Sequence, residues 1–122
     1  MGRGLALRGS VLAARLNQAG RVIAVGNDGD VMMNIQEMET AHRIGLSLAL
    51  VAWVDGAIGL IEDRQERDTG DCADLSFNDI AWDQLAKAFC RSHVGCRTRA
   101  DLRDALVADA KKMPPFALST YL

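Results

Sequence analysis

Residues 22–36 read VIAVGNDGDVMMNIQ, and the order of residue types in this segment indicates the fold class. An aliphatic run at 22–25 is followed by the polar turn NDGD at 27–30, and the residues after the turn return to helical spacing. This order is typical of a buried parallel strand that leads into a ligand-facing loop and then into a helix. We therefore predict that the turn lies at the carboxyl end of a strand, the edge at which open α/β sheets bind ligands.

The rest of the chain alternates in the same way between apolar runs and helical spacing. Asn34 and Glu37 resemble a helix-capping pair, and Gly45 is expected to end the helix that follows them. The alternation predicts a three-layer α/β sandwich with a mainly parallel sheet between helices. The expected elements are a helix at 5–18, the strand at 22–25, a helix from 34 to 45, a strand at 48–54, a helix at 58–66, a long loop at 67–79 on the ligand edge, a helix at 81–90, a strand at 93–97, a helix at 99–112 and a strand at 116–122.

Size and charge limit the functional classes open to the chain. Its 122 residues suit one domain, residues 1–122, with a core of ordinary size. The 14 Lys and Arg against 16 Asp and Glu give a net charge of −2, which argues against nucleic acid or an anionic membrane as a partner. The apolar run at 46–54 is too short to span a bilayer.

The same sequence favours a cytoplasmic location. Arg8 and Arg15 interrupt the apolar N-terminal stretch before it reaches the length of a secretory signal, so we interpret residues 1–16 as mature sequence. Three cysteines are an odd number at low density, which is typical of a reducing compartment.

Four blocks of the chain together resemble a known family. They are GRGLALRGSVLAARL (2–16), the stretch from VIAVGNDGD to IEDRQ (22–65), DLSFNDIAWDQLAKAF (74–89) and RTRADLRDALVADA (97–110). In this order they resemble the C-terminal, diphosphate-binding domain of thiamine-diphosphate enzymes, and among these most closely the acetolactate synthases. The block NIQEMETA at 34–41 is the most specific part of the resemblance.

The resemblance implies a Mg²⁺ ion that bridges the protein to the diphosphate of the cofactor. In the family, an Asp side chain, an Asn side chain and a main-chain carbonyl hold this ion, as suits a hard cation that prefers oxygen ligands. By position, Asp28 matches the Asp and Gly56 matches the residue that gives the carbonyl, so these are the expected metal ligands. The expected cofactor-binding residues are Asn27, Asp28, Gly29, Asp30, Met33 and Asn34, where a helix beginning near Met33 would also offer amide hydrogens to the diphosphate.

Two positions depart from the family pattern. Asn27 stands where the family has the first glycine of its motif, and Val54 stands where it has the Asn ligand. Asn adopts left-handed backbone conformations more easily than most residues, so the first change is tolerable. The isopropyl group of Val54 offers no oxygen to a metal, and Asp55, the next residue, is the alternative source of one.

The resemblance also implies what the chain lacks. In the family, the Glu that activates the cofactor belongs to a different domain, and a strand and a helix precede the part that Met1 begins. We therefore expect a domain truncated at its N-terminus, without catalytic residues of its own, that binds thiamine diphosphate weakly or not at all in isolation. With the missing domains, the implied reaction is decarboxylation of pyruvate and transfer of the two-carbon unit to a second 2-oxo acid. The alternative is a non-catalytic fragment or a homo-oligomerisation module that keeps the fold without cofactor.

Several other residues have a plainer interpretation. Cys90, His93 and Cys96 have the spacing C-x₂-H-x₂-C and could form a zinc site with Cys72, but core or incidental cysteines are the favoured interpretation. Trp53, in the apolar run at 48–54, is expected in the core.

Overall fold

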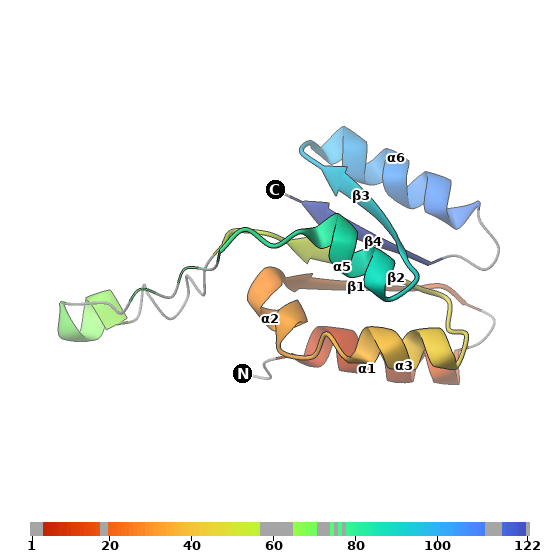
Figure 1. Ribbon diagram of the computed structural model, residues 1–122, viewed down its shortest axis with the longest axis horizontal. Coiled ribbons are helices and arrows are strands. Elements are labelled where there is room, and N and C mark those ends of the chain that lie inside the picture. Colours follow the sequence, from red (N-terminus) through yellow and green to blue (C-terminus); the bar gives the residue numbers. More distant parts are fainter. Residues whose placement is uncertain are drawn as a thin grey trace.

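The fold is built on a four-stranded parallel sheet (Figure 1). The computed structural model describes residues 4–17, 20–56, 65–70, 74, 76, 78–111 and 116–121. The strands lie side by side in the order β1-β2-β4-β3, and each neighbouring pair is parallel. Their bounds are β1 Val22–Asn27, β2 Leu48–Trp53, β3 Ser92–Cys96 and β4 Phe116–Tyr121. The predicted parallel sheet is confirmed.

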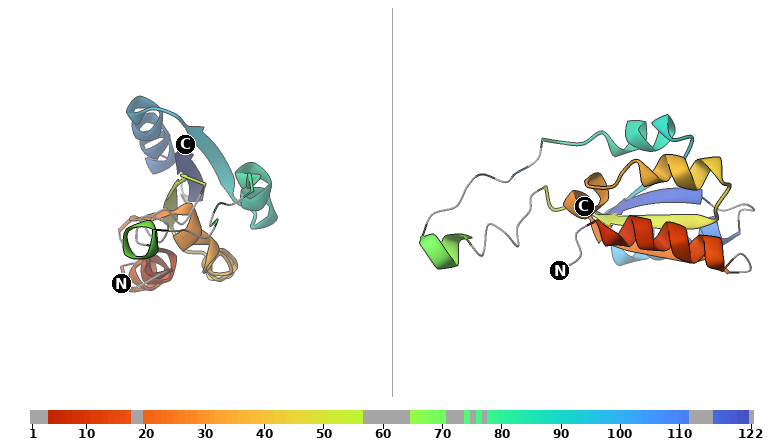
Figure 2. Two further views of the ribbon diagram at one scale, coloured as in Figure 1. Left: turned by 90° about the vertical axis from the view of Figure 1, so that its left-hand side faces the viewer. Right: turned by 90° about the horizontal axis from the view of Figure 1, so that it is seen from below.

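Helices cover both faces of the sheet, which confirms the predicted three layers. Helices α1, α3 and α5 lie along one face, where α5 packs against β3, and α6 lies on the other (Figures 1 and 2). No helix in the described ranges is long and apolar enough to cross a bilayer. The helix expected at 58–66 falls mostly outside the described residues. The helix bounds are α1 Leu5–Leu16, α2 Asp28–Met32, α3 Glu37–Arg43, α5 Trp82–Ala88 and α6 Arg99–Ala110.

The main core lies on the face that α1 and α3 cover. There, alternate residues of β1 and β2 point toward the helices, because successive side chains of a strand point to opposite faces. The central strand β2 is buried on both faces along residues 48–52, as expected for a strand inside a parallel sheet. The core cluster consists of Leu7, Val11, Ala14, Ala24, Val31, Met38, Ala41, Leu46, Leu48, Leu50, Ala52, Trp82 and Ala86.

The helix after β1 begins earlier than predicted. Helix α2 begins at Asp28, where the Asn27 side chain accepts a hydrogen bond from the Asp30 amide at 2.8 Å and so caps the first turn. Helix α3 then begins at Glu37, and its N-cap residue, Gln36, makes no side-chain capping bond. The prediction of Asn34 as the cap was therefore wrong, because Asn27 caps the first helix and Asn34 is buried.

Trp53 also differs from the prediction. It is the last residue of β2, and 54% of it is exposed to solvent. Its register partners Asn27 and Tyr121 are likewise the last residues of their strands, so Trp53 lies at the carboxyl edge of the sheet rather than within the core.

Two helices end in the same motif with different residues at the left-handed position. After α3, the amides of Gly45 and Leu46 donate to the carbonyls of His42 and Ala41, and Gly45 has φ 65°. After α5, the amides of Cys90 and Arg91 donate to Lys87 and Ala86, and Cys90 has φ 57°. These are Schellman motifs, in which glycine is normally favoured at the left-handed residue.

Cys90→Gly is expected to raise the free energy of unfolding by about 0.5–1 kcal/mol, because an L-residue is strained in the left-handed region. Gly45→Ala is expected to lower it by about 1 kcal/mol for the same reason, since a Cβ at Gly45 would meet no atom within 4 Å and adds only backbone strain. Urea unfolding of both variants checks the pair, and Cys90→Ala, which keeps the Cβ, should give no gain. A gain in Cys90→Ala equal to that in Cys90→Gly would assign the effect to the thiol instead.

Candidate functional site

Asp28 is the centre of the candidate site, at the carboxyl end of β1. Only 1% of it is exposed, which is unusual for a carboxylate. Its Oδ1 accepts a hydrogen bond from the Gly29 amide at 2.8 Å, and its Oδ2 accepts one from the Gly56 amide at 2.9 Å. The second bond joins the end of β1 to the segment that follows β2, so the structure brings together the two residues expected to bind metal.

The charge environment of Asp28 is unfavourable for a lone carboxylate. Burial raises the pKa of Asp28 most, and the neighbouring Asp55 carboxyl raises it further through its charge and a hydrogen bond. The amides of Gly56 and Gly29 lower the pKa of Asp28 without cancelling these effects. A buried carboxyl group beside a second, exposed one favours a bound proton or a cation at Asp28.

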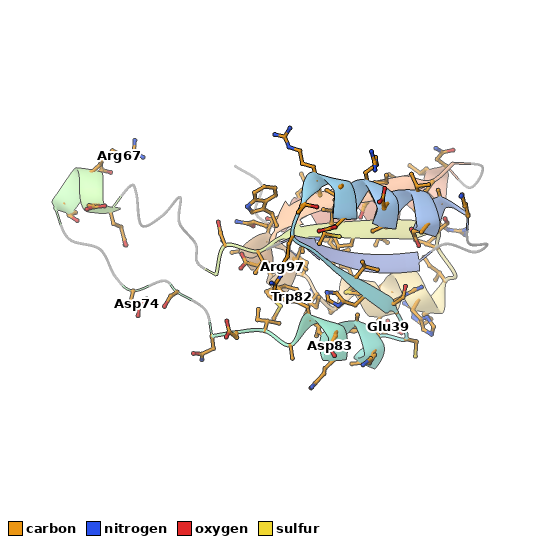
Figure 3. All side chains as sticks on the ribbon, turned by 90° about the horizontal axis from the view of Figure 1, so that it is seen from above. Glu39, Arg67, Asp74, Trp82, Asp83 and Arg97 are labelled. Carbon is orange, nitrogen blue, oxygen red and sulfur yellow. The ribbon has the colours of Figure 1, made fainter. Side chains whose placement is uncertain are left out.

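A cavity of about 310 Å³ opens beside Asp28. One wall comes from the ends of β1 and β2, and the other from the segment that leads into α5. Trp82, at the start of α5, is buried and lies on the side of that helix that faces the sheet (Figure 3). The lining residues are Asp28, Val54, Gly56, Asn78, Asp79, Ile80 and Trp82.

None of the residues that form the second wall of this cavity was predicted individually as a site residue. The sequence predicted that the loop at 67–79 lies on the ligand edge, and its described members Asn78 and Asp79 do line the cavity. Trp82 falls within the helix expected at 81–90, and neither it nor Ile80 was predicted to be a site residue. The signal that could have found them is their place at the point where that loop returns to the sheet.

The other expected cofactor residues do not all face the cavity. Asp30 accepts a hydrogen bond from the amide of Gly4, the N-cap residue of α1. Asn34 is buried against Gly4, where a Cβ would lie 1.7 Å from the Asn34 side-chain nitrogen. Met33 follows α2 and is 42% exposed. In the structure, the described contacts of Asp30 and Asn34 therefore fasten the start of α1 to the turn after β1.

The donor set around Asp28 fits a hard divalent cation. Val54 lines the cavity and offers no oxygen, as the sequence indicated. Asp55 offers another oxygen, because its carboxyl group lies close enough to Asp28 to raise the pKa of Asp28. Carboxylates are the kind of oxygen donors that Mg²⁺ accepts alongside phosphate oxygens.

The cysteine and histidine cluster does not form a metal site in the described residues. Cys90 is exposed at the end of α5, whereas Cys96 is buried in β3, where burial raises the pKa of its thiol. Burial lowers the pKa of His93. No three His, Cys, Asp or Glu side chains within the described ranges are grouped to hold a metal, and Cys72 lies outside those ranges.

The chain is similar to several known proteins. Residues 1–118 match the family described as "Thiamine pyrophosphate enzyme, C-terminal TPP binding domain". The acetolactate synthase isozyme 1 large subunit of Escherichia coli (strain K12) is 36% identical over 62 residues, which are 51% of this chain and 11% of that protein. The acetolactate synthase large subunit of Buchnera aphidicola subsp. Schizaphis graminum is 27% identical over 94 residues, 75% of this chain and 16% of that protein.

A solved structure shares the fold. The thiamine diphosphate-dependent 4-hydroxybenzoylformate decarboxylase of Rhodococcus jostii RHA1 superposes with a TM-score of 0.85 at 17% identity, over 98% of this chain and 23% of that one. The chain thus spans 11% and 16% of the length of the two curated relatives and under a quarter of the solved neighbour.

Proposed function

This chain belongs to the thiamine pyrophosphate enzyme family, as a C-terminal TPP-binding domain, and from that premise we propose that it binds the diphosphate of thiamine diphosphate through a Mg²⁺ ion at Asp28. The observation that carries the proposal is the buried Asp28 carboxylate, which accepts a hydrogen bond from the Gly56 amide at the carboxyl edge of the sheet. Ligands of open α/β sheets bind at this edge.

In this proposal Asp28 and the Gly56 carbonyl are ligands of the cation, and Asp55 provides the second carboxylate in place of an Asn side chain. Asn27 and Gly29 shape the turn, because Asn27 caps α2 and the Gly29 amide holds one Asp28 oxygen in place. The cavity beside them, closed on its far side by Ile80 and Trp82, would receive the diphosphate end of the cofactor.

The cofactor, when bound, supplies the electron sink for decarboxylation of a 2-oxo acid, and the protein supplies its binding and orientation. Because relatives of this chain are named acetolactate synthases, we propose that the complete enzyme decarboxylates pyruvate and transfers the two-carbon unit to a second 2-oxo acid. The residues described here position the diphosphate and contain no group assigned to proton transfer. We further propose a cytoplasmic, oligomeric enzyme, in which the 122 residues alone are inactive.

Val54→Asn is expected to strengthen Mg²⁺-dependent binding of thiamine diphosphate by about tenfold, because it adds an oxygen donor on the cavity wall next to Asp28. Heteronuclear NMR titration measures the change, since we expect binding by the isolated chain to be weak. Val54→Leu, which fills the same wall without an oxygen, is the matched control and should not bind more tightly. Equal affinities for the wild type and Val54→Asn would count against placing residue 54 beside the cation.

The alternative function, a module that keeps the fold without cofactor, predicts a different outcome of the same titration. In that case neither Mg²⁺ nor thiamine diphosphate would shift the amide resonances of Gly29 and Gly56 in a saturable way. The neighbouring Asp28 and Asp55 carboxyl groups favour the cofactor-binding function, because the negative charge of the exposed Asp55 makes it costly to keep the buried Asp28 ionised without a cation.

A further inference from the structure

Trp82 is a buried tryptophan on the far wall of the cavity beside Asp28. Only 7% of it is exposed, and the opposite wall of the cavity includes Asp28 and Val54. Trp82 is the first residue of α5 (Figure 3), and its main-chain N–H donates to the Ile80 carbonyl at 2.8 Å, where the chain turns from the loop into the helix. The start of a helix and packing in the core therefore hold the ring at the cavity.

The indole N–H of Trp82 has no hydrogen-bond partner among the residues that the structure describes. This group can only donate, and a buried tryptophan usually finds an acceptor for it. The nitrogen is not fully enclosed either, because it is not one of the described side-chain nitrogens that are both enclosed and without a bond. Since Trp82 borders the cavity, its N–H is an open donor that a molecule in the cavity can reach.

The carboxylates that line the cavity do not serve this donor. The two oxygens of Asp28 accept hydrogen bonds from the amides of Gly29 and Gly56. Asp79, which is exposed on the same wall as Trp82, makes no hydrogen bond to the indole in the structure. A ligand that satisfies the N–H must bring its own acceptor, and the anionic oxygens of a phosphate are among the strongest acceptors.

We propose that the indole N–H of Trp82 donates a hydrogen bond to a diphosphate oxygen of the bound cofactor, from the wall that faces Asp28. This inference rests on the cofactor site proposed at Asp28, and it adds a residue that contacts the anion directly. The cation at Asp28 would hold the diphosphate from one wall and the indole N–H from the other. Helix α5 then takes part in cofactor binding, because its first residue supplies the donor.

The indole proton of Trp82 tests the proposal by NMR in the wild-type chain. The chain contains two tryptophans, so the spectrum of Trp53→Phe retains one indole resonance and assigns Trp82. Titration with Mg²⁺ and pyrophosphate should move the Trp82 indole proton downfield, with the same saturation curve as the amides of Gly29 and Gly56. Thiamine with Mg²⁺, which lacks the diphosphate, should leave the indole proton unchanged. Saturable shifts of the two amides with an unmoved indole would overturn this proposal and leave the cofactor site standing, whereas no shift of any of them would overturn both.

Removing only the N–H measures what the hydrogen bond contributes to binding. Benzothienylalanine in place of Trp82 keeps the size and shape of the ring but has sulfur where the N–H was, so packing in the core is preserved. We expect the Mg²⁺-dependent affinity for thiamine diphosphate to fall about fivefold. The same replacement at Trp53, which is 54% exposed at the end of β2, is the matched control and should leave the affinity unchanged. Equal affinities of the wild type and of the chain altered at Trp82 would overturn the proposal.

Discussion

Arg21→Ala is expected to lower the free energy of unfolding by about 3–5 kcal/mol, the largest stability change that we expect from one substitution in this chain. Arg21 precedes β1 and forms an ion pair with Asp109 near the end of α6, so the pair fastens α6 to the first strand of the sheet. The Asp109 side chain is only 4% exposed. Removing Arg21 would leave this buried carboxylate without its counter-charge, and that loss is far more costly than the loss of a surface pair.

The matched control is Arg103→Ala, which breaks the ion pair with Asp104. Those side chains are 72% and 68% exposed, so the expected loss is below about 1 kcal/mol. Urea unfolding monitored by circular dichroism measures both variants. The double variant Arg21→Ala/Asp109→Ala should recover part of the loss, because it removes the stranded charge as well. A loss in Arg21→Ala no greater than that in Arg103→Ala would show that Asp109 does not need its partner.

Asp28→Asn is expected to weaken Mg²⁺-dependent binding of thiamine diphosphate by at least about tenfold, the largest functional effect of a single substitution. Asn has the same shape but lacks the negative charge, and its single oxygen can accept only one of the two hydrogen bonds that Gly29 and Gly56 now donate to separate oxygens of Asp28. Asp104→Asn removes the same charge from an exposed position and is the control. NMR titration with Mg²⁺ and thiamine diphosphate together measures the affinity.

A second titration, with Mg²⁺ alone, separates the cation from the cofactor. If Asp28→Asn lost binding of both, the carboxylate would be acting as a metal ligand. If it bound both as well as the wild type does, Asp28 would be a structural residue that only joins the ends of β1 and β2 through the Gly56 amide.

The strand-turn-helix unit around Asp28 could be predicted because its signals are local. An aliphatic run, a polar turn and helical spacing follow one another within 22–36, and the structure has β1 and α2 in that order. The end of β2 could also be predicted to lie at the same edge of the sheet as the end of β1, because parallel strands end on the same side of a sheet. The assignment of Asp28 and Gly56 to one site came from the family resemblance, and the parallel order of β1 and β2 explains why the two residues meet.

The orientation of α1 could not be predicted, because both of its faces carry apolar residues. The buried face contains Ser10, whose hydroxyl donates to the Leu7 carbonyl at 2.7 Å and so needs no water. The exposed face contains the leucines Leu5, Leu12 and Leu16. A hydrophobicity pattern cannot tell which of the two faces is buried.

The far wall of the cavity depends on tertiary structure in a different way. Asn78, Ile80 and Trp82 reach the Asp28 edge because the chain returns there from a long loop, and local periodicity does not encode where a loop returns. The burial of Asn34 likewise depends on a contact between residues that are far apart in the sequence. It resembles a cap in sequence, but the close approach of Gly4 buries it.

Paramagnetic relaxation by Mn²⁺, in the presence of thiamine diphosphate, tests the cation site most directly, because Mn²⁺ accepts the same oxygen ligands as Mg²⁺ and broadens nearby amide resonances. The proposed site predicts that the amides of Gly29 and Gly56 broaden first, in a saturable way that excess Mg²⁺ reverses. Broadening centred on exposed acidic residues elsewhere, with the resonances of Gly29 and Gly56 unchanged, would contradict it.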